Sequence, residues 1–355
     1  MSHLITSSEP HFHDAGRAEP VLEVEDLHVE FRTPRGTVNA VNGVTYQLAA
    51  GETLAILGES GSGKSVSAQA VMGLIETPPG HITKGAIRFR GNDLLQQPED
   101  ERRRVRGQRI AMVFQDALTA LNPVFTVGWQ IGEMLRVHAG LSRRDAKARA
   151  IELMDRVGIP SARQRVNQYP HEFSGGMRQR AMIAMALALE PDVLIADEPT
   201  TALDVTVQAQ VMDLLAELQE QTGMGLILIT HDLGVVAEVA DRLAVMYAGR
   251  IVETGTVAQL YARPAHPYTE GLMRSIPQLD QRKGELDPIE GAPPSLTAIP
   301  SGCPFHPRCP YRRDDCVTVE PPPYDVTDGQ PVEAGDLTVR RTSACHYFQE
   351  VLHGQ

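Results

Sequence analysis

The sequence predicts an α/β protein: a parallel α/β core with an N-terminal antiparallel β region, an inserted helical subdomain and a small, metal-stapled C-terminal extension. Short apolar runs, DVLIAD, GLILIT and RLAVMY, alternate with helical stretches, which is typical of a buried parallel sheet. Another apolar run, ETLAIL, leads into a glycine-rich turn and then a helical stretch, KSVSAQAVMGLI. The four cysteines all follow residue 300, which indicates a local device rather than a general disulfide framework.

The size and charge of the chain narrow its class of function. Its 355 residues, 42% of them hydrophobic, are enough for one large core and a smaller appendage. With 33 Lys and Arg against 45 Asp and Glu, the net charge is −12, which argues against nucleic acid as the main partner. The N-terminus lacks the apolar segment of a signal peptide, and no stretch approaches the roughly 18 apolar residues of a membrane span. We therefore expect a soluble chain that does not bind nucleic acid.

The pattern along the chain predicts four segments. Residues 1–20 are polar and aperiodic, so we expect a flexible leader. Residues 21–275 form the main domain, which begins with alternating, strand-like stretches and is helical in character from about 115 to 175. Residues 276–300 are rich in proline and polar residues and predict an irregular linker. The cysteine-bearing extension, 301–355, is therefore predicted to be a separate unit.

One helix of the inserted subdomain is predicted in detail. In SRRDAKARAIELMDRVG, Ser142 is placed to cap the helix and Gly158 to end it. Ile151, Met154 and Val157 share one face at helical spacing, which predicts the side that packs on the core.

The stretch GESGSGKS fits the G-x-x-x-x-G-K-[ST] pattern and lies between a predicted strand and a predicted helix, as that pattern requires. Glycines allow backbone N–H groups to curl around phosphates, and the start of the helix adds a positive potential. Lys64 can neutralise β- and γ-phosphate oxygens, and Ser65 can offer its hydroxyl to Mg²⁺. A chance glycine loop is the alternative. The candidate nucleotide-binding residues are Gly58, Ser60, Gly61, Gly63, Lys64 and Ser65.

A pair of acidic residues follows the apolar run DVLIAD. Asp197 and Glu198 would stand at the carboxyl end of a parallel strand, where ligands bind in open α/β sheets. One carboxylate suits Mg²⁺ and the other suits a water molecule. Taken alone, such a pair is also compatible with a helix cap, but the phosphate-binding pattern upstream favours the catalytic interpretation.

A second candidate anion site begins the apolar helix MRQRAMIAMALAL. Ser174, Gly175 and Gly176 precede it, so free amides at a helix start could receive a phosphate, although a plain helix cap is the simpler interpretation. Gln115 ends the predicted strand IAMVFQ, and His231 ends LILITH. These five features follow one another along the chain: the glycine-rich loop, Gln115, the serine and glycines at the helix start, the acidic pair and His231.

Together these motifs resemble the ATP-binding subunit of ABC transporters, and the resemblance spans roughly residues 21–275. In that family two cassettes pair head to tail, so each ATP lies between the Walker A motif of one chain and the signature of the other. Walker A corresponds to Gly58–Ser65, the Q-loop to Gln115, the signature to Ser174–Gln179, Walker B to Asp197 and Glu198, the D-loop to Ala202–Asp204, and the switch histidine to His231.

The resemblance also implies individual roles in ATP hydrolysis. Glu198 would polarise the attacking water, His231 would contact the γ-phosphate, and Lys64 would stabilise charge on the transferred phosphoryl group. Ser65, Gln115 and Asp197 would hold Mg²⁺. Phe31 would stack on adenine, or it would be a core residue.

Further segments narrow the resemblance to the ATPases of oligopeptide and dipeptide importers. These segments are QDALTALNPVFTVGWQIGE, YPHEFSGGMRQRAMIAMAL and RPAHPYTEGLMRSIP, together with the cysteine-bearing tail. The ATPase of a nickel or other solute importer is an alternative, although the nickel branch generally lacks such a tail. A soluble ABC ATPase of translation or DNA maintenance is a further alternative, against which stand the single cassette and the acidic charge.

The resemblance implies partners and a location. These are a second, related ATPase subunit in a heterodimer, two transmembrane permeases and an extracytoplasmic substrate-binding protein. The chain would then be peripheral, on the cytoplasmic face of the cell membrane.

The cysteines are spaced C-x5-C-x6-C-x28-C, at Cys303, Cys309, Cys316 and Cys345. Disulfides, zinc and an iron–sulfur cluster all remain compatible with this spacing. Disulfides suit a reducing compartment poorly, and zinc sites usually hold tighter cysteine pairs. The resemblance to peptide-importer tails implies a 4Fe-4S cluster, with zinc as the alternative. His306 and His346 flank the cysteines, either as bystanders or as substitute zinc ligands. In either case the metal would supply folding energy to a tail with little core.

Overall fold

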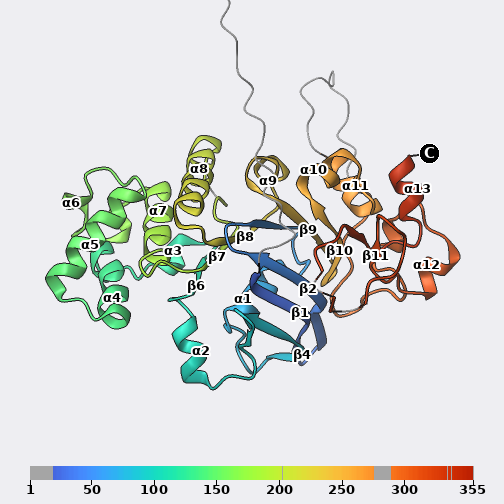
Figure 1. Cartoon of the computed structure of the whole chain (residues 1–355), viewed down its shortest axis with the longest axis horizontal. Coiled ribbons are helices and arrows are strands. Elements are labelled where there is room, and N and C mark those ends of the chain that lie inside the picture. The colour runs from blue at the N-terminus through green and yellow to red at the C-terminus, as the bar shows by residue number, and fades with distance from the viewer. Residues whose placement is uncertain (1–18, 202, 276–288, 334, 337, 355) are drawn as a thin grey trace, which may run out of the picture.

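The computed structural model describes residues 19–201, 203–275, 289–333, 335–336 and 338–354. Within these residues the strands form two sheets, with a helical region at one end of the molecule and the C-terminal extension at the other (Figure 1). The expected leader lies outside the described residues except for Glu19 and Pro20, and so do residues 276–288 of the expected linker.

The N-terminal residues form an antiparallel sheet, which confirms the predicted β region. Its order is β2-β1-β4-β5, with β1 (Pro20–Thr33), β2 (Gly36–Ala49), β4 (Gly80–Phe89) and β5 (Asn92–Asp93). The sequence alternates because one face of the sheet is buried. On that face Val24 and Ile87 share a hydrophobic cluster with Ile56 and Ala68 from the neighbouring layer.

The second sheet forms the α/β core, in the order β11-β12-β10-β9-β3-β8-β7-β6. Five neighbouring strands are parallel: β3 (Thr53–Leu57), β6 (Ile110–Val113), β7 (Val193–Asp197), β8 (Gly225–Thr230) and β9 (Arg242–Tyr247). Every residue of these strands is buried, which explains their continuous apolar sequence. β10 (Arg250–Thr256) pairs antiparallel with β9.

The parallel order has a direct consequence for the candidate site. The carboxyl ends of β3, β7 and β8 meet at one edge of the sheet, because these strands run in the same direction. The phosphate-binding pattern, the acidic pair and His231 follow these three strands in turn. We call this region the nucleotide edge, defined by Gly58–Ser65, Asp197, Glu198 and His231.

Helices surround the core and extend it on one side. They are α1 (Lys64–Val71), α2 (Glu99–Val105), α3 (Ala117–Ala120), α4 (Val127–Ala139), α5 (Arg143–Arg156), α6 (Ala162–Arg165), α7 (Gly175–Ala186), α8 (Val205–Thr222), α9 (Leu233–Val239), α10 (Val257–Ala262) and α11 (Pro267–Arg274), with a 3-10 turn η1 (Pro170–Glu172). Helices α3 to α7 gather at the left of Figure 1, next to α8. This confirms that helices are inserted between β6 and β7.

The helix predicted from Ser142 is α5. The Ser142 side chain accepts a hydrogen bond from the amide of Asp145, and Gly158 follows the helix with φ of 71°. Met154 and Val157 are buried and Ile151 is partly buried on the predicted face. Capping and periodicity therefore predicted this helix correctly.

The C-terminal extension completes the sheet instead of standing apart from it. Its elements are η2 (His306–Arg308), α12 (Asp314–Thr318), β11 (Tyr324–Asp325), β12 (Thr342–Ser343) and α13 (Phe348–His353). β12 pairs with β10, so the extension adds two strands to the core sheet. Phe305 and Cys303 share a hydrophobic cluster with Val245 and Tyr247 of β9. The extension is thus stabilised by the core of the main domain.

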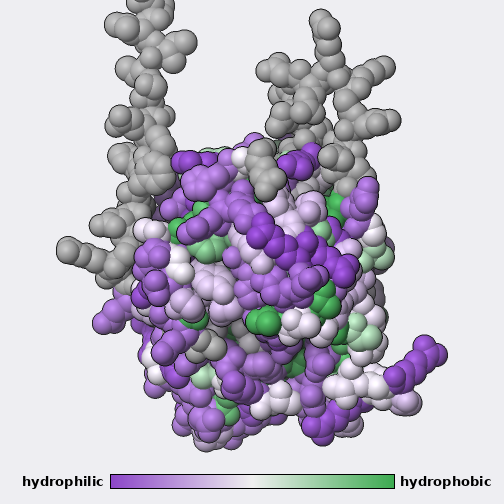
Figure 2. Space-filling model, turned by 90° about the vertical axis from the view of Figure 1, so that its right-hand side faces the viewer, coloured by the Kyte–Doolittle hydropathy of each residue, from purple (hydrophilic) through white to green (hydrophobic). Residues whose placement is uncertain are grey.

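The side of the molecule that carries the extension is mostly hydrophilic, with scattered hydrophobic residues (Figure 2). Phe305, Phe348 and Val351 of the extension are buried, so these apolar side chains lie inside. Across the described residues, none of the helices combines the length and the apolar character needed to cross a membrane.

Candidate nucleotide-binding site

The glycine-rich loop joins β3 to α1 and folds tightly against neighbouring backbone. A Cβ on Gly58 would lie 2.2 Å from the carbonyl oxygen of Met246, and a Cβ on Gly63 would lie 2.2 Å from that of Ala40. Gly63 is the N-cap residue of α1, with φ of 103°, and no side chain caps this helix. The loop therefore needs glycine for steric reasons, and the start of α1 is not covered by a capping side chain.

Lys64 lies inside this loop, with only 5% of the residue exposed. Its Nζ donates hydrogen bonds to the carbonyl oxygens of Gly58 at 2.7 Å and Glu59 at 3.0 Å. Burial lowers the pKa of Lys64, whereas the charges of Glu198, Asp197 and Glu59 raise it. A cation is thus held at the centre of a loop that contains Gly61 and Ser60 at its exposed tip.

Ser65 and Asp197 come together although they are far apart in the sequence. The Ser65 hydroxyl donates to Oδ1 of Asp197 at 2.9 Å. Burial raises the pKa of Asp197, the hydrogen bond from Ser65 lowers it, and the charge of Glu198 raises it further. A hydroxyl and a carboxylate side by side are hard oxygen donors of the kind that Mg²⁺ prefers. Another polar group of the loop, Oγ of Ser62, is buried without a hydrogen-bond partner among the described residues, so the loop also retains an unused polar group for a ligand.

Glu198 is the meeting point of the other candidate residues. Its Oε2 accepts hydrogen bonds from Nε2 of Gln115 and from the Thr201 hydroxyl, both at 2.9 Å, and its Oε1 lies 3.5 Å from Nδ1 of His231. The Glu198 amide donates to the carbonyl oxygen of Ile229 on β8.

The backbone at Glu198 is unusual. It has φ of 44°, in the left-handed region that costs a non-glycine residue about 1–3 kcal/mol and that is concentrated at functional sites. The structure therefore aims one carboxylate between the ends of β6, β7 and β8.

The second candidate anion site lies at the start of α7, with the helical subdomain and away from α1 (Figure 1). Ser174 caps α7 by accepting a hydrogen bond from the amide of Met177 at 3.3 Å, and Ser174 and Gly175 are exposed. A Cβ on Gly176 would lie 2.8 Å from Cγ1 of Val207, so glycine allows α7 and α8 to pack closely. The serine therefore serves as a helix cap within this chain, and its exposure leaves it accessible to a second molecule.

Comparison with known proteins decides the family. A model of the ABC transporter family matches residues 41–201, and a model of the oligopeptide/dipeptide transporter C-terminal region matches residues 252–316. The dipeptide transport ATP-binding protein of Bacillus subtilis is 52% identical over 321 residues, which cover 90% of this chain and 94% of that protein. The chain belongs to the ABC transporter family. It is thus an ABC-type ATPase, in agreement with the order of its motifs.

Other relatives agree with this assignment. The oligopeptide transport ATP-binding protein of Bacillus subtilis is 55% identical over 313 residues, which cover 88% of this chain and 87% of that protein. Among solved structures, a dimeric ATP-binding cassette in a post-hydrolysis state with ADP and Pi matches with a TM-score of 0.60 and 26% identity, over 66% of this chain and 98% of its own. A Clostridium perfringens subunit of an ABC transporter complex matches with a TM-score of 0.58 and 30% identity, over 68% and 91%.

Two predicted elements of the ABC site are placed less decisively. Phe31 lies on β1 opposite Gly80, is partly buried and packs against the hydrophobic cluster of the antiparallel sheet. Its contacts match the core interpretation, and stacking on adenine stays a prediction. In the D-loop, Ala202 lies outside the described residues, whereas Asp204 caps α8 by accepting from the amide of Val207.

The four cysteines, which we call the cysteine unit, form no disulfide and line one small cavity. Burial, and to a lesser degree the neighbouring thiols, raises the pKa of Cys303 to about 11 and those of Cys309 and Cys345 to about 12, although backbone hydrogen bonds lower them. In the part of the chain that the structure describes, no group of three or more His, Cys, Asp or Glu side chains is arranged to hold a metal ion. The predicted metal staple is therefore not supported by this arrangement, although the predicted grouping of the thiols around one cavity is observed.

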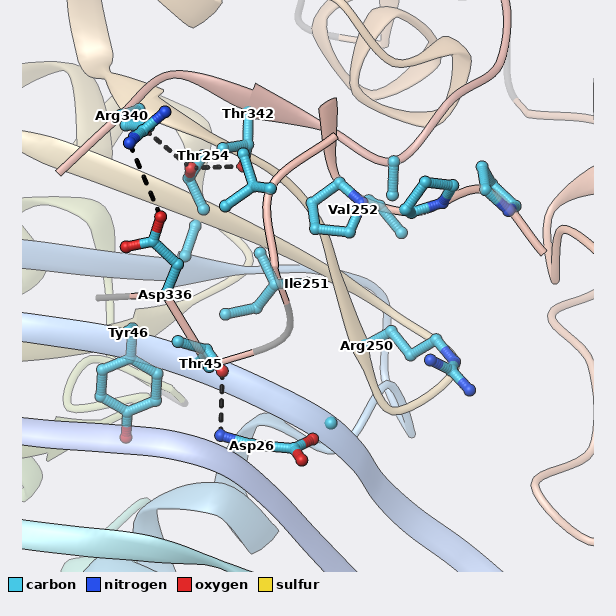
Figure 3. Close-up of a pocket in the computed structure, with 18 of the residues that line it drawn as sticks. Asp26, Thr45, Tyr46, Arg250, Ile251, Val252, Thr254, Asp336, Arg340 and Thr342 are labelled. Carbon is cyan, nitrogen blue, oxygen red and sulfur yellow. Dashed lines mark hydrogen bonds and ion pairs between the residues drawn. The ribbon is translucent and has the colours of Figure 1, made fainter. Parts of the chain in front are cut away.

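A cavity of about 460 Å³ lies between the antiparallel sheet and the extension (Figure 3), and none of residues Gly58–Ser65 lines it. Its polar lining is largely paired internally: Asp26 accepts from His28 at 2.9 Å and pairs with Lys84, while Thr254 and Thr342 share a hydrogen bond at 2.8 Å. We assign no function to this cavity.

Sequence reasoning missed two residues at the nucleotide edge. The Thr201 hydroxyl donates a hydrogen bond to the carboxylate of Glu198. Arg308 of the extension forms an ion pair with Glu59 of the Walker A loop. One feature of the sequence could have indicated the contact between Arg308 and Glu59. Glu59 is an acidic residue inside a phosphate-binding loop, and such a residue calls for a cation nearby.

Proposed function

We propose that this chain is the ATP-hydrolysing motor subunit of an ABC importer for oligopeptides or dipeptides. The observation that carries the proposal is the convergence of Lys64, Ser65, Asp197 and Glu198 at one edge of the sheet in a chain whose residues 252–316 match the peptide-transporter C-terminal region. The proposed cassette spans residues 21–275, with a linker to about 300 and the extension after it.

ATP with Mg²⁺, when bound, supplies the phosphoryl group and the charge of the metal. Glycine amides of the loop Gly58–Ser65 and the start of α1 bind the phosphates, and Lys64 stabilises negative charge on the group being transferred. Ser65 and Asp197, which are hydrogen-bonded to each other, are proposed to hold Mg²⁺, and Gln115, which contacts the neighbouring Glu198, is proposed as a further ligand.

Glu198 is proposed to orient and polarise the attacking water, with His231 beside it to contact the γ-phosphate. In the present arrangement Gln115 and Thr201 occupy one carboxylate oxygen of Glu198. These two residues are proposed to keep the carboxylate aimed until a nucleotide arrives, and Gln115 to couple nucleotide binding to the helical subdomain.

The partners follow from the exposed signature. Ser174, Gly175 and Gly176 are proposed to act on a nucleotide held by a second, related ATPase subunit, so that the working form is a heterodimer. Two permeases and an extracytoplasmic substrate-binding protein complete the proposed importer, with this chain peripheral on the cytoplasmic face of the membrane.

The permeases are proposed to dock at the start of α4. Phe125 and Trp129 are about 40% exposed, and their rings stack with centroids 4.1 Å apart. Gly132 and Val166 line a groove of about 320 Å³ next to Trp129. Exposed aromatic side chains beside a groove are typical of a site for a partner helix.

The cysteine unit is proposed to hold a 4Fe-4S cluster, with zinc as the alternative. Four thiols around one cavity match the Cys₄ donor set of such clusters, and the buried thiols have raised pKa values that a bound metal would reverse. No group of three or more His, Cys, Asp or Glu side chains among the described residues is arranged to hold a metal ion, so either metal would require the thiols to come closer together.

Uptake by intact cells tests the proposed function. We expect cells whose only copy carries Glu198→Gln to lose ATP-dependent uptake of labelled di- or oligopeptides and to keep nickel uptake. Glu217→Gln, an exposed acidic residue on α8, is the matched control and should change neither. Loss of nickel uptake with normal peptide uptake would favour the nickel importer. If neither uptake changes and the chain copurifies with ribosomes or with DNA, the soluble ATPase of translation or DNA maintenance would be favoured.

A further inference from the structure

The Walker A loop of this chain contains an acidic residue next to its lysine. Glu59 supplies a backbone oxygen to Lys64, and its charge is one of those that raise the pKa of Lys64. A carboxylate at this position is unfavourable for a loop that binds phosphate groups, because like charges repel strongly where the site is partly desolvated. Its charge must therefore be balanced within the protein.

Arg308 of the extension supplies the positive charge that balances the carboxylate of Glu59. Its Nη1 and Nη2 donate to Oε2 and Oε1 of Glu59 at 2.7 and 3.0 Å, which is the two-pronged geometry of a strong Arg–carboxylate pair. The Arg308 side chain is 5% exposed and that of Glu59 is 28% exposed, so the arginine is shielded from solvent while the carboxylate is partly open to it. A second residue near the extension, Tyr268, accepts a hydrogen bond from the Glu59 amide at 2.9 Å.

The rest of the guanidinium is also held in place. Nε donates to the carbonyl oxygen of Glu290 at 3.0 Å, Nη2 to that of Ile289 at 3.3 Å, and Nη1 to the Tyr247 hydroxyl at 3.4 Å. The rings of Tyr247 and Phe305 flank it, each 5.9 Å from the guanidinium carbon. Arg308 ends the turn η2, directly before Cys309 of the cysteine unit. It is therefore a rigid, fully bonded cation aimed at one residue of the Walker A loop.

We propose that Arg308 is a positioning residue for nucleotide binding, which neutralises Glu59 and holds it toward the extension so that the Walker A loop can accept phosphate groups. The proposal rests on the proposed function, since it assumes that Gly58–Ser65 bind the phosphates of ATP. It assigns to the extension a direct part in the nucleotide site, separate from any metal that the extension binds.

A purely structural role for Arg308 makes different predictions. If Arg308 only joined the extension to the core, removing Glu59 as well would leave the defect unchanged or worsen it, because one more bond would be lost. If Arg308 acts by neutralising Glu59, removing the carboxylate rescues binding in the Arg308 variant. The double-mutant cycle therefore separates the two.

The experiment measures equilibrium binding of a non-hydrolysable ATP analogue with Mg²⁺ to the full chain, at low and high ionic strength, together with thermal unfolding. We expect Arg308→Gln to raise Kd by about five- to thirtyfold at low salt, within the usual coupling of a close charged pair, and by less at high salt. The pair Glu59→Gln with Arg308→Gln should bind within about threefold of wild type, while its melting temperature stays as low as that of Arg308→Gln.

Two further variants keep the test decisive. Arg313→Gln removes another arginine of the extension, which pairs with Glu350, and should leave Kd unchanged. Glu59→Gln alone should bind at least as tightly as wild type, a result that does not depend on the stability of any Arg308 variant. Failure of wild-type and Arg313→Gln chains to bind the analogue would overturn the proposed function itself. Normal binding by Arg308→Gln, weakened binding by Glu59→Gln, or no rescue in the double variant would overturn only the role of Arg308.

Discussion

The nucleotide edge and the cysteine unit both bring together residues that are distant in the sequence, yet their chemistry differs. At the nucleotide edge the Ser65 hydroxyl donates a hydrogen bond to Asp197, and the side chain of Gln115 donates one to Glu198. In the cysteine unit four thiols share a cavity, and burial raises the pKa of three of them. The first region is held in shape by its own side chains, whereas the second holds groups that would gain most from a bound metal.

The two regions therefore differ in how strongly their arrangement depends on a bound ligand. Polar groups that satisfy one another can wait in position for a substrate, which is what electrostatic preorganisation requires. Buried thiols in apolar surroundings contribute as small hydrophobic groups until a metal converts them to thiolates. The variants below either remove a group from the first region or block a ligand of the second.

A large effect on both nucleotide binding and hydrolysis is expected from Lys64→Ala. Removing the buried cation should lower hydrolysis by about 10²–10³-fold, because the charge that stabilises the transferred group is lost. Nucleotide affinity should also fall about tenfold, as a charge-assisted contact with phosphate disappears. Turnover assays and equilibrium titration measure the two separately. Lys84→Ala, on the antiparallel sheet, is the control and should behave as wild type. Normal binding and hydrolysis by Lys64→Ala would show that this loop is not part of the nucleotide site.

The next effect is that of Ser174→Arg, which blocks the exposed signature. We expect normal nucleotide binding by this chain but about tenfold or greater loss of hydrolysis in the complex with its partner ATPase, because the two-chain site cannot close. Ser142→Arg is a matched control, since Ser142 caps α5 as Ser174 caps α7 and costs about 1 kcal/mol when lost. Equal hydrolysis by both variants would argue against a shared site.

A smaller and more local effect is expected from Cys309→Ser. The full chain, purified without air, should be brown and contain about four iron and four sulfide per chain, as a 4Fe-4S cluster requires. Cys309→Ser should lose the metal and become protease-sensitive in the extension. His306→Asn and His346→Asn should keep the iron if only thiolates bind it. If the wild-type protein is colourless and contains one zinc ion per chain, the 4Fe-4S cluster is wrong and the cysteine unit holds zinc.

The smallest effect is a pH dependence within the fold. Burial raises the pKa of Glu253 to about 7, although the amides of Ala265 and His266 donate to its carboxylate and Arg341 lies 3.6 Å away. Because the folded state holds this proton more tightly than the unfolded state, Glu253 contributes its full stability below pH 4.5 and loses it as pH rises through 7.

The measurement for Glu253 is a difference in free energy of unfolding between wild type and Glu253→Gln. We expect the advantage of wild type to shrink by about 1–2 kcal/mol between roughly pH 5 and pH 8, since ionisation cannot occur in the variant. Burial also lowers the pKa of His266 to about 3, so its contribution is lost as pH falls below 6.5, but it is common to both chains and cancels. A constant difference would contradict the raised pKa.

The sequence predicted which elements bring their residues to the nucleotide edge, because the patterns that identify those elements are local. Gly58–Ser65 form one continuous loop, and Asp197 and Glu198 end a strand that the apolar pattern identifies. Neither the left-handed backbone of Glu198 nor the hydrogen bond from Gln115 could be predicted, because both depend on how β6, β7 and β8 meet.

The extension was harder to predict for the same reason. Its packing against the core depends on contacts such as that of Arg308 with Glu59, which are 249 residues apart. Cysteine spacing indicated that the thiols gather, and it could not fix the distances that decide between zinc, a cluster and no metal. Phe31 shows a related limit, since its strand was predicted but the direction of its ring was not.

The central claim is that Glu198 serves hydrolysis and not nucleotide binding, and one comparison tests it most directly. Equilibrium nucleotide titration and ATP turnover are measured on the same preparations of wild type, Glu198→Gln and the surface control Glu217→Gln, each with the partner ATPase. We expect Glu198→Gln to bind nucleotide within about threefold of wild type and to lose about 10²–10⁴-fold in turnover, while Glu217→Gln should keep both normal binding and normal turnover. Near-normal turnover by Glu198→Gln would contradict it.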